Sequence, residues 1–296
     1  GPSIIMNPDL GQLHPYPFEK LAALKANATP PEHLSHIALS IGEPKHPTPG
    51  FITQAIVEHL DGLSHYPTTA GTIELRQTIA EWLNNRFQLN DNINAVTQVL
   101  PVNGTREALF AFGQAMIDRH APNPAILMPN PFYQIYEGAA LLAGAEPIYL
   151  NCDAENGFVP DFDQVDSATW QRCQLIYLCS PSNPTGAVID AAQLHRLIKL
   201  AHQYDFIIAS DECYSEIYLD EDQPPVGLLQ AAHQAGYTDF SRCVVFHSLS
   251  KRSNAPGLRS GFVAGDATIL KQFLRYRTYH GCAMPPATQS ASIRAW

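Results

Sequence analysis

The sequence runs Leu175-Ile176-Tyr177-Leu178-Cys179, then through a helical pattern at residues 191–204, and then Phe206-Ile207-Ile208-Ala209. The two short runs are almost entirely apolar, which is typical of strands buried on both faces of a sheet. The segment between them is long enough for a crossover helix, and strands joined by such a helix run parallel. This stretch therefore predicts a β-α-β unit of an α/β fold.

The same alternation continues on both sides of this unit. Further strand-like runs lie at residues 96–102, 125–128, 147–150, 244–247 and 262–264. Helical spacing of apolar residues occurs at residues 51–60, 71–87, 106–118, 135–144, 228–235 and 266–277. Residues 6–50 are instead rich in proline, which indicates an irregular N-terminal arm. We expect a three-layer α/β domain with a mostly parallel central sheet covered by helices on both faces.

The composition excludes several classes of protein. The chain has 296 residues and a net charge of −10, which argues against nucleic acid or an anionic membrane as a partner. No apolar run approaches the length of a membrane span, and no signal-peptide pattern opens the chain. Six cysteines and twelve histidines without metal-ligand spacing predict a reduced, cytoplasmic protein with no metal site. Gly1-Pro2-Ser3 is interpreted as the remnant of a cleaved tag.

Polar clusters follow several of the predicted strands. Asn103-Gly104-Thr105-Arg106 opens a helix after residues 96–102, Asn183 lies in a loop rich in proline and glycine, and Asp211 and Tyr214 follow residues 206–209. Ligands of open α/β sheets bind beyond the carboxyl ends of the strands. Taken singly, each cluster is also explained by a helix cap or a turn. Their occurrence at successive strand ends favours one shared binding site.

A further cluster, after residues 244–247, contains a candidate nucleophile. Ser248-Leu249-Ser250-Lys251 is followed eight residues later by Arg259. A lysine can form a Schiff base with an aldehyde, and hydroxyls with an arginine can hold a phosphate dianion. Pyridoxal phosphate combines an aldehyde with a phosphate, and a carboxylate such as Asp211 can pair with its pyridinium nitrogen. The clusters together therefore predict a pyridoxal phosphate site.

These motifs resemble those of the fold-type-I pyridoxal phosphate enzymes of the aspartate aminotransferase superfamily. The resemblance covers residues 17–296, and the separations from Asn183 to Asp211 and from Lys251 to Arg259 match the family pattern. The motifs that carry it are Ile41-Gly42-Glu43-Pro44, Tyr66-Pro67, Glu74-Leu75-Arg76, Asn103-Gly104-Thr105-Arg106, Pro131-Phe132-Tyr133, Asn183-Pro184-Thr185-Gly186, Asp211-Glu212-Cys213-Tyr214 and residues 248–259.

The resemblance implies a role for each matching residue. Lys251 would hold the cofactor as a Schiff base and act as general base and acid at the substrate α-carbon. Asp211 would pair with the pyridine nitrogen, and Tyr214 and Asn183 would bind the phenolic oxygen. Tyr133 would stack on the ring face. The residues implied to bind the phosphate are Gly104, Thr105, Arg106, Ser248, Ser250 and Arg259, with Tyr66 reaching the phosphate of a neighbouring subunit in a homodimer.

More narrowly, residues 14–21, 41–49 and 276–281 resemble bacterial N-succinyldiaminopimelate aminotransferases. This implies transfer of an amino group between N-succinyl-LL-2,6-diaminopimelate and 2-oxoglutarate, in lysine and diaminopimelate biosynthesis. The Gly42 backbone would meet the substrate carboxylate. We expect Arg277, with Tyr279 or His280, to read the distal end of the substrate in trans; the alternative is that Arg277 only finishes a surface helix.

The resemblance also implies a division of the chain. Residues 1–50 are expected to hold the tag remnant, the N-terminal arm and a small-domain segment, and residues 51–280 the large cofactor-binding domain. Residues 281–296 would begin a small C-terminal domain. The family's carboxylate-binding arginine lies far downstream of the lysine. We therefore expect it outside this chain, and we expect poor turnover by residues 1–296 alone.

Two other classes of function remain open. One is an aminotransferase for another substrate, or a carbon–sulfur lyase on the same scaffold. The other is a regulatory binding module with an aminotransferase-like fold, although such proteins carry a basic winged-helix segment that this sequence lacks.

Overall fold

The computed structural model describes residues 4–14, 47–130, 133–182, 185–216, 224–249, 259–281 and 283–296. Its centre is a seven-stranded sheet in the order β1-β7-β6-β5-β4-β2-β3. The strands are β1 (Val99–Val102), β2 (Ala125–Asn130), β3 (Glu146–Asn151), β4 (Cys173–Cys179), β5 (Ile207–Asp211), β6 (Cys243–Ser248) and β7 (Gly261–Gly265). β7 pairs antiparallel with both β1 and β6, and the other neighbours are parallel. Every strand except β7 therefore ends at the same edge.

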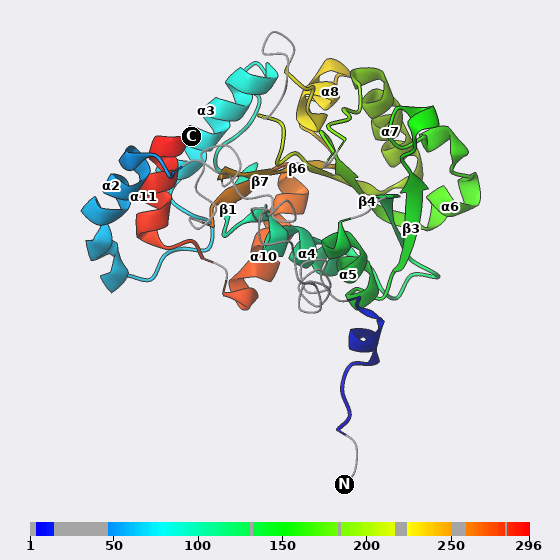
Figure 1. The fold of residues 1–296 in the computed structure, drawn as a ribbon, viewed down its shortest axis with the longest axis horizontal. Coiled ribbons are helices and arrows are strands. Elements are labelled where there is room, and N and C mark those ends of the chain that lie inside the picture. Colours follow the sequence, from blue (N-terminus) through cyan, green and yellow to red (C-terminus); the bar gives the residue numbers. More distant parts are fainter. Residues whose placement is uncertain are drawn as a thin grey trace, which may run out of the picture.

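Helices cover both faces of the sheet (Figure 1). One face carries α4 (Thr105–Met116), α5 (Gln134–Leu142) and α10 (Ala267–His280). The other carries α3 (Ile73–Phe87), α7 (Ala191–Tyr204) and α8 (Leu228–Gln234). The short α6 (Ser167–Arg172) leads into β4. The 3-10 helices are η1 (Pro8–Gln12), η2 (Leu60–Ser64), η3 (Ala154–Asn156) and η4 (Phe162–Gln164). The sheet thus has the expected three layers.

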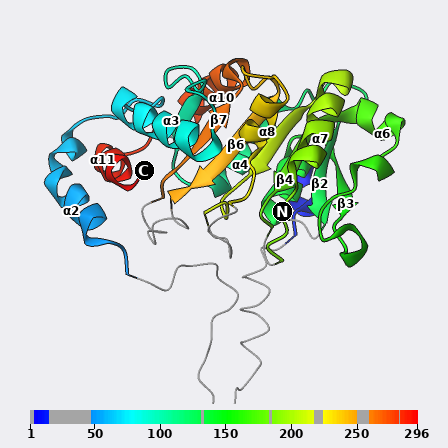
Figure 2. The ribbon, with the colours of Figure 1, turned by 90° about the horizontal axis from the view of Figure 1, so that it is seen from above.

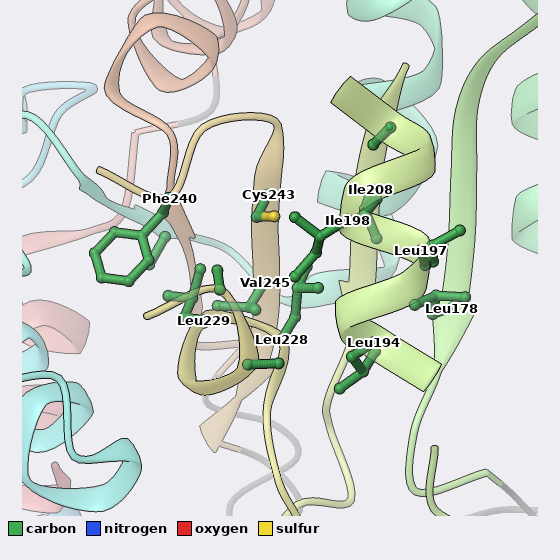
Figure 3. Close-up of a cluster of buried hydrophobic side chains, with 14 of the residues drawn as sticks. Leu178, Leu194, Leu197, Ile198, Ile208, Leu228, Leu229, Phe240, Cys243 and Val245 are labelled. Carbon is green, nitrogen blue, oxygen red and sulfur yellow. The ribbon is translucent and has the colours of Figure 1, made fainter. Parts of the chain in front are cut away.

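Each face of the sheet has its own hydrophobic core, because successive side chains of a strand point to opposite faces. Leu178, Ile208 and Val245 pack against α7 and α8 (Figure 3). Their neighbours Tyr177 and Phe246 belong to the core on the α4 and α5 side. Both sets are buried, which explains why these strands are apolar at nearly every position.

A third, smaller cluster lies beside the β1 end of the sheet. There α2 (Gly50–Glu58) packs against α11 (Pro286–Ala295), so that segments far apart in the sequence lie side by side (Figure 2). Ile52, Ala55 and Ala291 are buried between them, together with Leu249 just after β6. The division into a large and a small domain stays a prediction.

The predicted α/β architecture is confirmed, with small shifts at the element ends. All seven expected strands are present, but β1 begins at Val99 rather than at residue 96. The reason is local, because the Asn94 side chain accepts hydrogen bonds from the backbone N–H groups of Val96 (2.8 Å) and Thr97 (3.2 Å) and closes a turn there. Among the helices in the described ranges, none is long and apolar enough to cross a membrane.

Candidate active site

The carboxyl ends of four strands meet at one edge of the sheet. Cys179 pairs with Asp211 across β4 and β5, and Gly261 at the start of β7 pairs with both Val102 of β1 and Ser248 of β6. The segments that follow β1, β4, β5 and β6 therefore emerge beside one another. This adjacency brings together the polar clusters that the sequence places at separate strand ends.

An anion cradle forms where β1 leads into α4. Gly104 precedes α4 with a φ of +99°, a conformation that favours glycine. A Cβ atom at this position would lie 2.6 Å from Nη2 of Arg259, so the missing side chain lets the guanidinium approach the backbone. The first N–H groups of α4 and the helix dipole favour a negative charge at the same place. Arg259 and the start of α4 thus fit a phosphate group, with Ser248 almost buried at the adjoining end of β6.

A buried carboxylate lies next to this cradle. Asp211 ends β5 and is 8% exposed. Its Oδ2 accepts a hydrogen bond from the Tyr136 hydroxyl (2.7 Å), and its Oδ1 accepts one from the Cys213 N–H (3.3 Å). Burial raises the pKa of Asp211, while the hydrogen bonds from Cys213 and Tyr136 and the charge of His247 oppose the rise. Each oxygen of a carboxylate can accept more than one hydrogen bond. Asp211 can therefore also accept one from a cationic N–H donor such as a pyridinium.

Tyr136 is a member of the site that the sequence did not reveal. It is fully buried on α5, and its ring stacks on Tyr177 with a centroid distance of 4.7 Å. Burial, followed by the charge of Asp211, raises the pKa of Tyr136 well above its ordinary value, so the hydroxyl stays protonated and donates. Its sequence signal, a tyrosine on the apolar face of a predicted helix, is the same as that of any core tyrosine.

The other aromatic candidates differ in their exposure. Tyr133 immediately precedes α5, is partly exposed, and meets the Tyr136 ring edge-to-face at 5.5 Å. Tyr214 is half-buried in the turn after β5. Tyr66 is fully exposed in the single chain. The Thr105 hydroxyl lies 3.3 Å from Sγ of Cys213, which links the cradle to the segment that carries Asp211.

Arg277, expected to read the distal end of the substrate, makes contacts within its own chain. Arg277 lies on α10 and has no exposed surface. Its Nη1 is 3.3 Å from Oε1 of Glu107 in the first turn of α4, and its guanidinium carbon is 5.7 Å from the centre of the Phe273 ring. In this single chain the guanidinium is therefore enclosed, and its contact with a substrate held by another subunit stays a prediction. Arg277 fixes the start of α4, whereas Tyr279 on the same helix is largely exposed.

The last candidates are one residue at the start of α4 and four that the structure does not describe. Arg106 is exposed in the first turn of α4. Gly42, Asn183, Ser250 and Lys251 lie outside the described residues.

Comparison with known protein families gives one match that spans most of the chain. The family model for aminotransferase class I and II matches residues 35–295. Among curated relatives, the LL-diaminopimelate aminotransferase of Nitratidesulfovibrio vulgaris (strain DSM 19637 / Miyazaki F) is 31% identical over 288 residues, which are 97% of this chain and 71% of the relative. The protein of the same name from Aquifex aeolicus (strain VF5) is 32% identical over 285 residues, 96% of this chain and 70% of the relative.

Solved structures agree with this match. An aminotransferase from Neisseria meningitidis Z2491 superposes with a TM-score of 0.92 at 51% identity, covering 98% of this chain and 73% of that one. The aminotransferase AspB from Helicobacter pylori 26695 gives 0.88 at 41% identity, with 96% and 73% covered. A phosphate cradle and a buried acid at one sheet edge are also what a pyridoxal 5'-phosphate site requires. On these grounds the chain belongs to the class I and II aminotransferases, a family that uses pyridoxal 5'-phosphate.

Proposed function

We propose that this chain transfers an amino group from a diaminopimelate-type donor to a 2-oxo acid with the help of pyridoxal 5'-phosphate. The observation that carries the proposal is the convergence of the Gly104–Arg259 cradle and the buried Asp211 at one sheet edge. These are suited to the two polar ends of the cofactor, its phosphate and its ring nitrogen. When bound, the cofactor supplies an electron sink for the charge that develops at the substrate α-carbon.

Each side chain then has a defined task. Lys251 anchors the cofactor and moves the proton at the substrate α-carbon. Asp211, held by Tyr136, would keep the ring nitrogen protonated. Tyr214 and Asn183 would bind the phenolic oxygen, and Tyr133 would contact the ring. The phosphate is bound by Gly104, Thr105, Arg106, Ser248, Ser250 and Arg259. The Gly42 backbone meets the substrate carboxylate.

For the donor we propose N-succinyl-LL-2,6-diaminopimelate, with 2-oxoglutarate as acceptor. Residues 14–21, 41–49 and 276–281 support this choice by their resemblance to succinyl-dependent enzymes. A second candidate is unacylated LL-diaminopimelate, which the names of the relatives at 31–33% identity favour. The two donors differ in charge at the distal end. In the succinyl donor an amide and a carboxylate replace the distal ammonium, so a cationic side chain would bind that end. The distal ammonium of the unacylated donor would instead be bound by an acidic side chain.

The proposed active unit is a cytoplasmic homodimer. Tyr66 of one subunit reaches the phosphate in the other, and the complete exposure of Tyr66 in the single chain is consistent with such a contact.

The proposal is tested on the full-length enzyme in two steps. Borohydride reduction followed by peptide mapping should place the pyridoxyl group on Lys251, and a label on another lysine rejects the assignment. A panel of donors with 2-oxoglutarate should then show the highest kcat/KM for N-succinyl-LL-2,6-diaminopimelate. Preference for the unacylated donor selects the second candidate, and release of a thiol and pyruvate from sulfur amino acids would indicate a lyase instead.

A further inference from the structure

A buried ionisable pair lies directly behind the proposed cofactor site. Glu212 follows Asp211 in the chain, and His247 precedes Ser248. Nε2 of His247 and Oε1 of Glu212 are 3.1 Å apart, and each side chain is only 3% exposed. The reaction proposed above uses neither residue. Burial of a carboxylate costs free energy unless hydrogen-bond donors surround it. A buried pair of this kind is therefore expected to have a structural or functional role.

The surroundings of the pair hold both side chains in one arrangement. The other carboxylate oxygen of Glu212 accepts hydrogen bonds from the Ser210 hydroxyl (3.0 Å) and from the N–H of Leu228 at the start of α8 (2.8 Å). The His247 ring stacks on Phe262 with a centroid distance of 5.1 Å and meets Trp82 edge-on at 5.4 Å. The hydrogen-bond donors around Glu212 and the aromatic rings around His247 hold both side chains in one geometry.

The pair and the proposed site residues occupy opposite faces of the same two strand ends. Asp211 contacts Tyr136 on the α5 side, whereas Glu212 lies near Phe87 and Leu228 on the α3 and α8 side. The backbone N–H of Glu212 donates to the carbonyl of Phe246 (3.0 Å), which is the last rung of the ladder between β5 and β6. The Glu212–His247 contact therefore cross-links the two strands one residue away from Asp211 and Ser248.

We propose that Glu212 and His247 are positioning residues of the cofactor site, which fix Asp211 and Ser248 in register from the far face of the sheet. This inference rests on the proposed contacts of Asp211 and Ser248 with the cofactor. The charge of His247 also favours the ionised form of Asp211, in agreement with a role toward that carboxylate. Loss of His247 leaves the Glu212 carboxylate buried with one donor fewer, so the strand ends must shift to admit water or another partner.

The test compares variants of the full-length protein by their Kd for pyridoxal 5'-phosphate, measured by fluorescence quenching, and by their Tm without cofactor. His247→Phe keeps an aromatic ring but removes the donor, and its Kd should rise about tenfold or more. His247→Gln restores an N–H donor and should bring the Kd back to within about threefold of wild type. In the double variant with His247→Phe and Glu212→Gln, a neutral amide replaces the carboxylate that has lost the His247 donor, so part of the lost affinity for the cofactor should return. Glu212→Gln alone should weaken cofactor binding.

Phe87→Leu is the matched control, because the Phe87 ring lies 5.7 Å from the His247 ring but takes no part in the pair. It should lower Tm while leaving the Kd within about twofold of wild type. The inference is overturned if folded His247→Phe has the same Kd for the cofactor as wild type. It is also overturned if Phe87→Leu raises the Kd as much as His247→Phe does when the two variants lose the same Tm. If His247→Phe does not fold, Glu212→Gln decides: an unchanged Kd overturns the inference. Unchanged Kd values in Asp211→Ala and Ser248→Ala would instead refute the proposed cofactor contacts themselves.

Discussion

At the scale of single residues, the ionisation of Asp211 depends on a few donors around one buried carboxyl. Removing the Tyr136 hydroxyl by Tyr136→Phe takes away the shorter of two hydrogen bonds to Asp211. We expect the Kd for pyridoxal 5'-phosphate to rise about tenfold and kcat to fall by a similar factor, because a hydrogen bond to a charged group is lost. Tyr177→Phe is the control, since the stacked Tyr177 donates only to the Leu109 carbonyl. It should lower Tm alone, and equal losses of affinity would remove Tyr136 from the site.

The raised pKa of Asp211 predicts a pH dependence of stability. A carboxyl whose pKa is higher in the folded than in the unfolded protein holds more protons when folded, so its contribution to stability is lost as the pH rises through the folded pKa. In the cofactor-free protein, the free energy of unfolding of wild type relative to Asp211→Asn should therefore fall as the pH rises from about 4 toward neutrality. Denaturant titrations at a series of pH values measure this difference, and a constant or rising difference contradicts the prediction.

The backbone conformation of Gly104 allows the close approach of Arg259 on which the proposed phosphate site depends. Gly104→Ala places a Cβ atom against the Arg259 guanidinium in a backbone conformation with a φ of +99°. We expect a roughly tenfold rise in the Kd for the cofactor and a loss of about 1 kcal/mol in stability. Gly157→Ala, also at positive φ but with no atom within 4 Å, should share the loss of stability only. Similar cofactor affinity in the two variants would show that the cradle does not need the glycine.

At the scale of elements, α10 holds the first turn of α4 through the buried Arg277. Arg277→Met should lower the free energy of unfolding by roughly 1–3 kcal/mol, because the contact with Glu107 is lost while the hydrocarbon packing stays. The KM values of a long diacid donor and of glutamate should change by the same factor, because the Arg277 guanidinium is buried against Glu107 within its own chain. Arg275→Met on the exposed side of the same helix should stay within about 0.5 kcal/mol of wild type. A KM effect confined to the long donor would instead support the substrate role of Arg277.

At the scale of the whole molecule, the proposed role of Tyr66 predicts active sites shared between subunits. Full-length Tyr66→Ala and Lys251→Ala should each be nearly inactive as homodimers. Subunit exchange in an equal mixture should restore about a quarter of wild-type activity, because half the dimers then hold one intact site. Activity after exchange, with the separate variants incubated alike as controls, is the measurement. Absence of recovery despite exchange would mean that Tyr66 serves its own chain.

The α/β fold and part of the candidate site can be predicted from local sequence. Residues 175–179 and 206–209 could be read as strands because a strand buried on both faces must be apolar at each position. Asp211 and the segment from Asn103 to Arg106 could be placed in a site because they follow such strands, and the ends of parallel strands collect ligands. These inferences need only chain direction, side-chain periodicity and the chemistry of each group.

Only the tertiary structure decided which distant side chains meet. Tyr136 and Asp211 are 75 residues apart, and Glu212 and His247 are 35 apart. Their contacts depend on the order of strands in the sheet and on the helix that covers each face. The burial of Arg277 likewise depends on α10 lying against α4, which its own helical pattern does not specify. The sequence determined the chemical groups and the strands that carry them. Which of these groups became neighbours was set by packing, since one apolar face can be buried against several partners with similar gain in free energy.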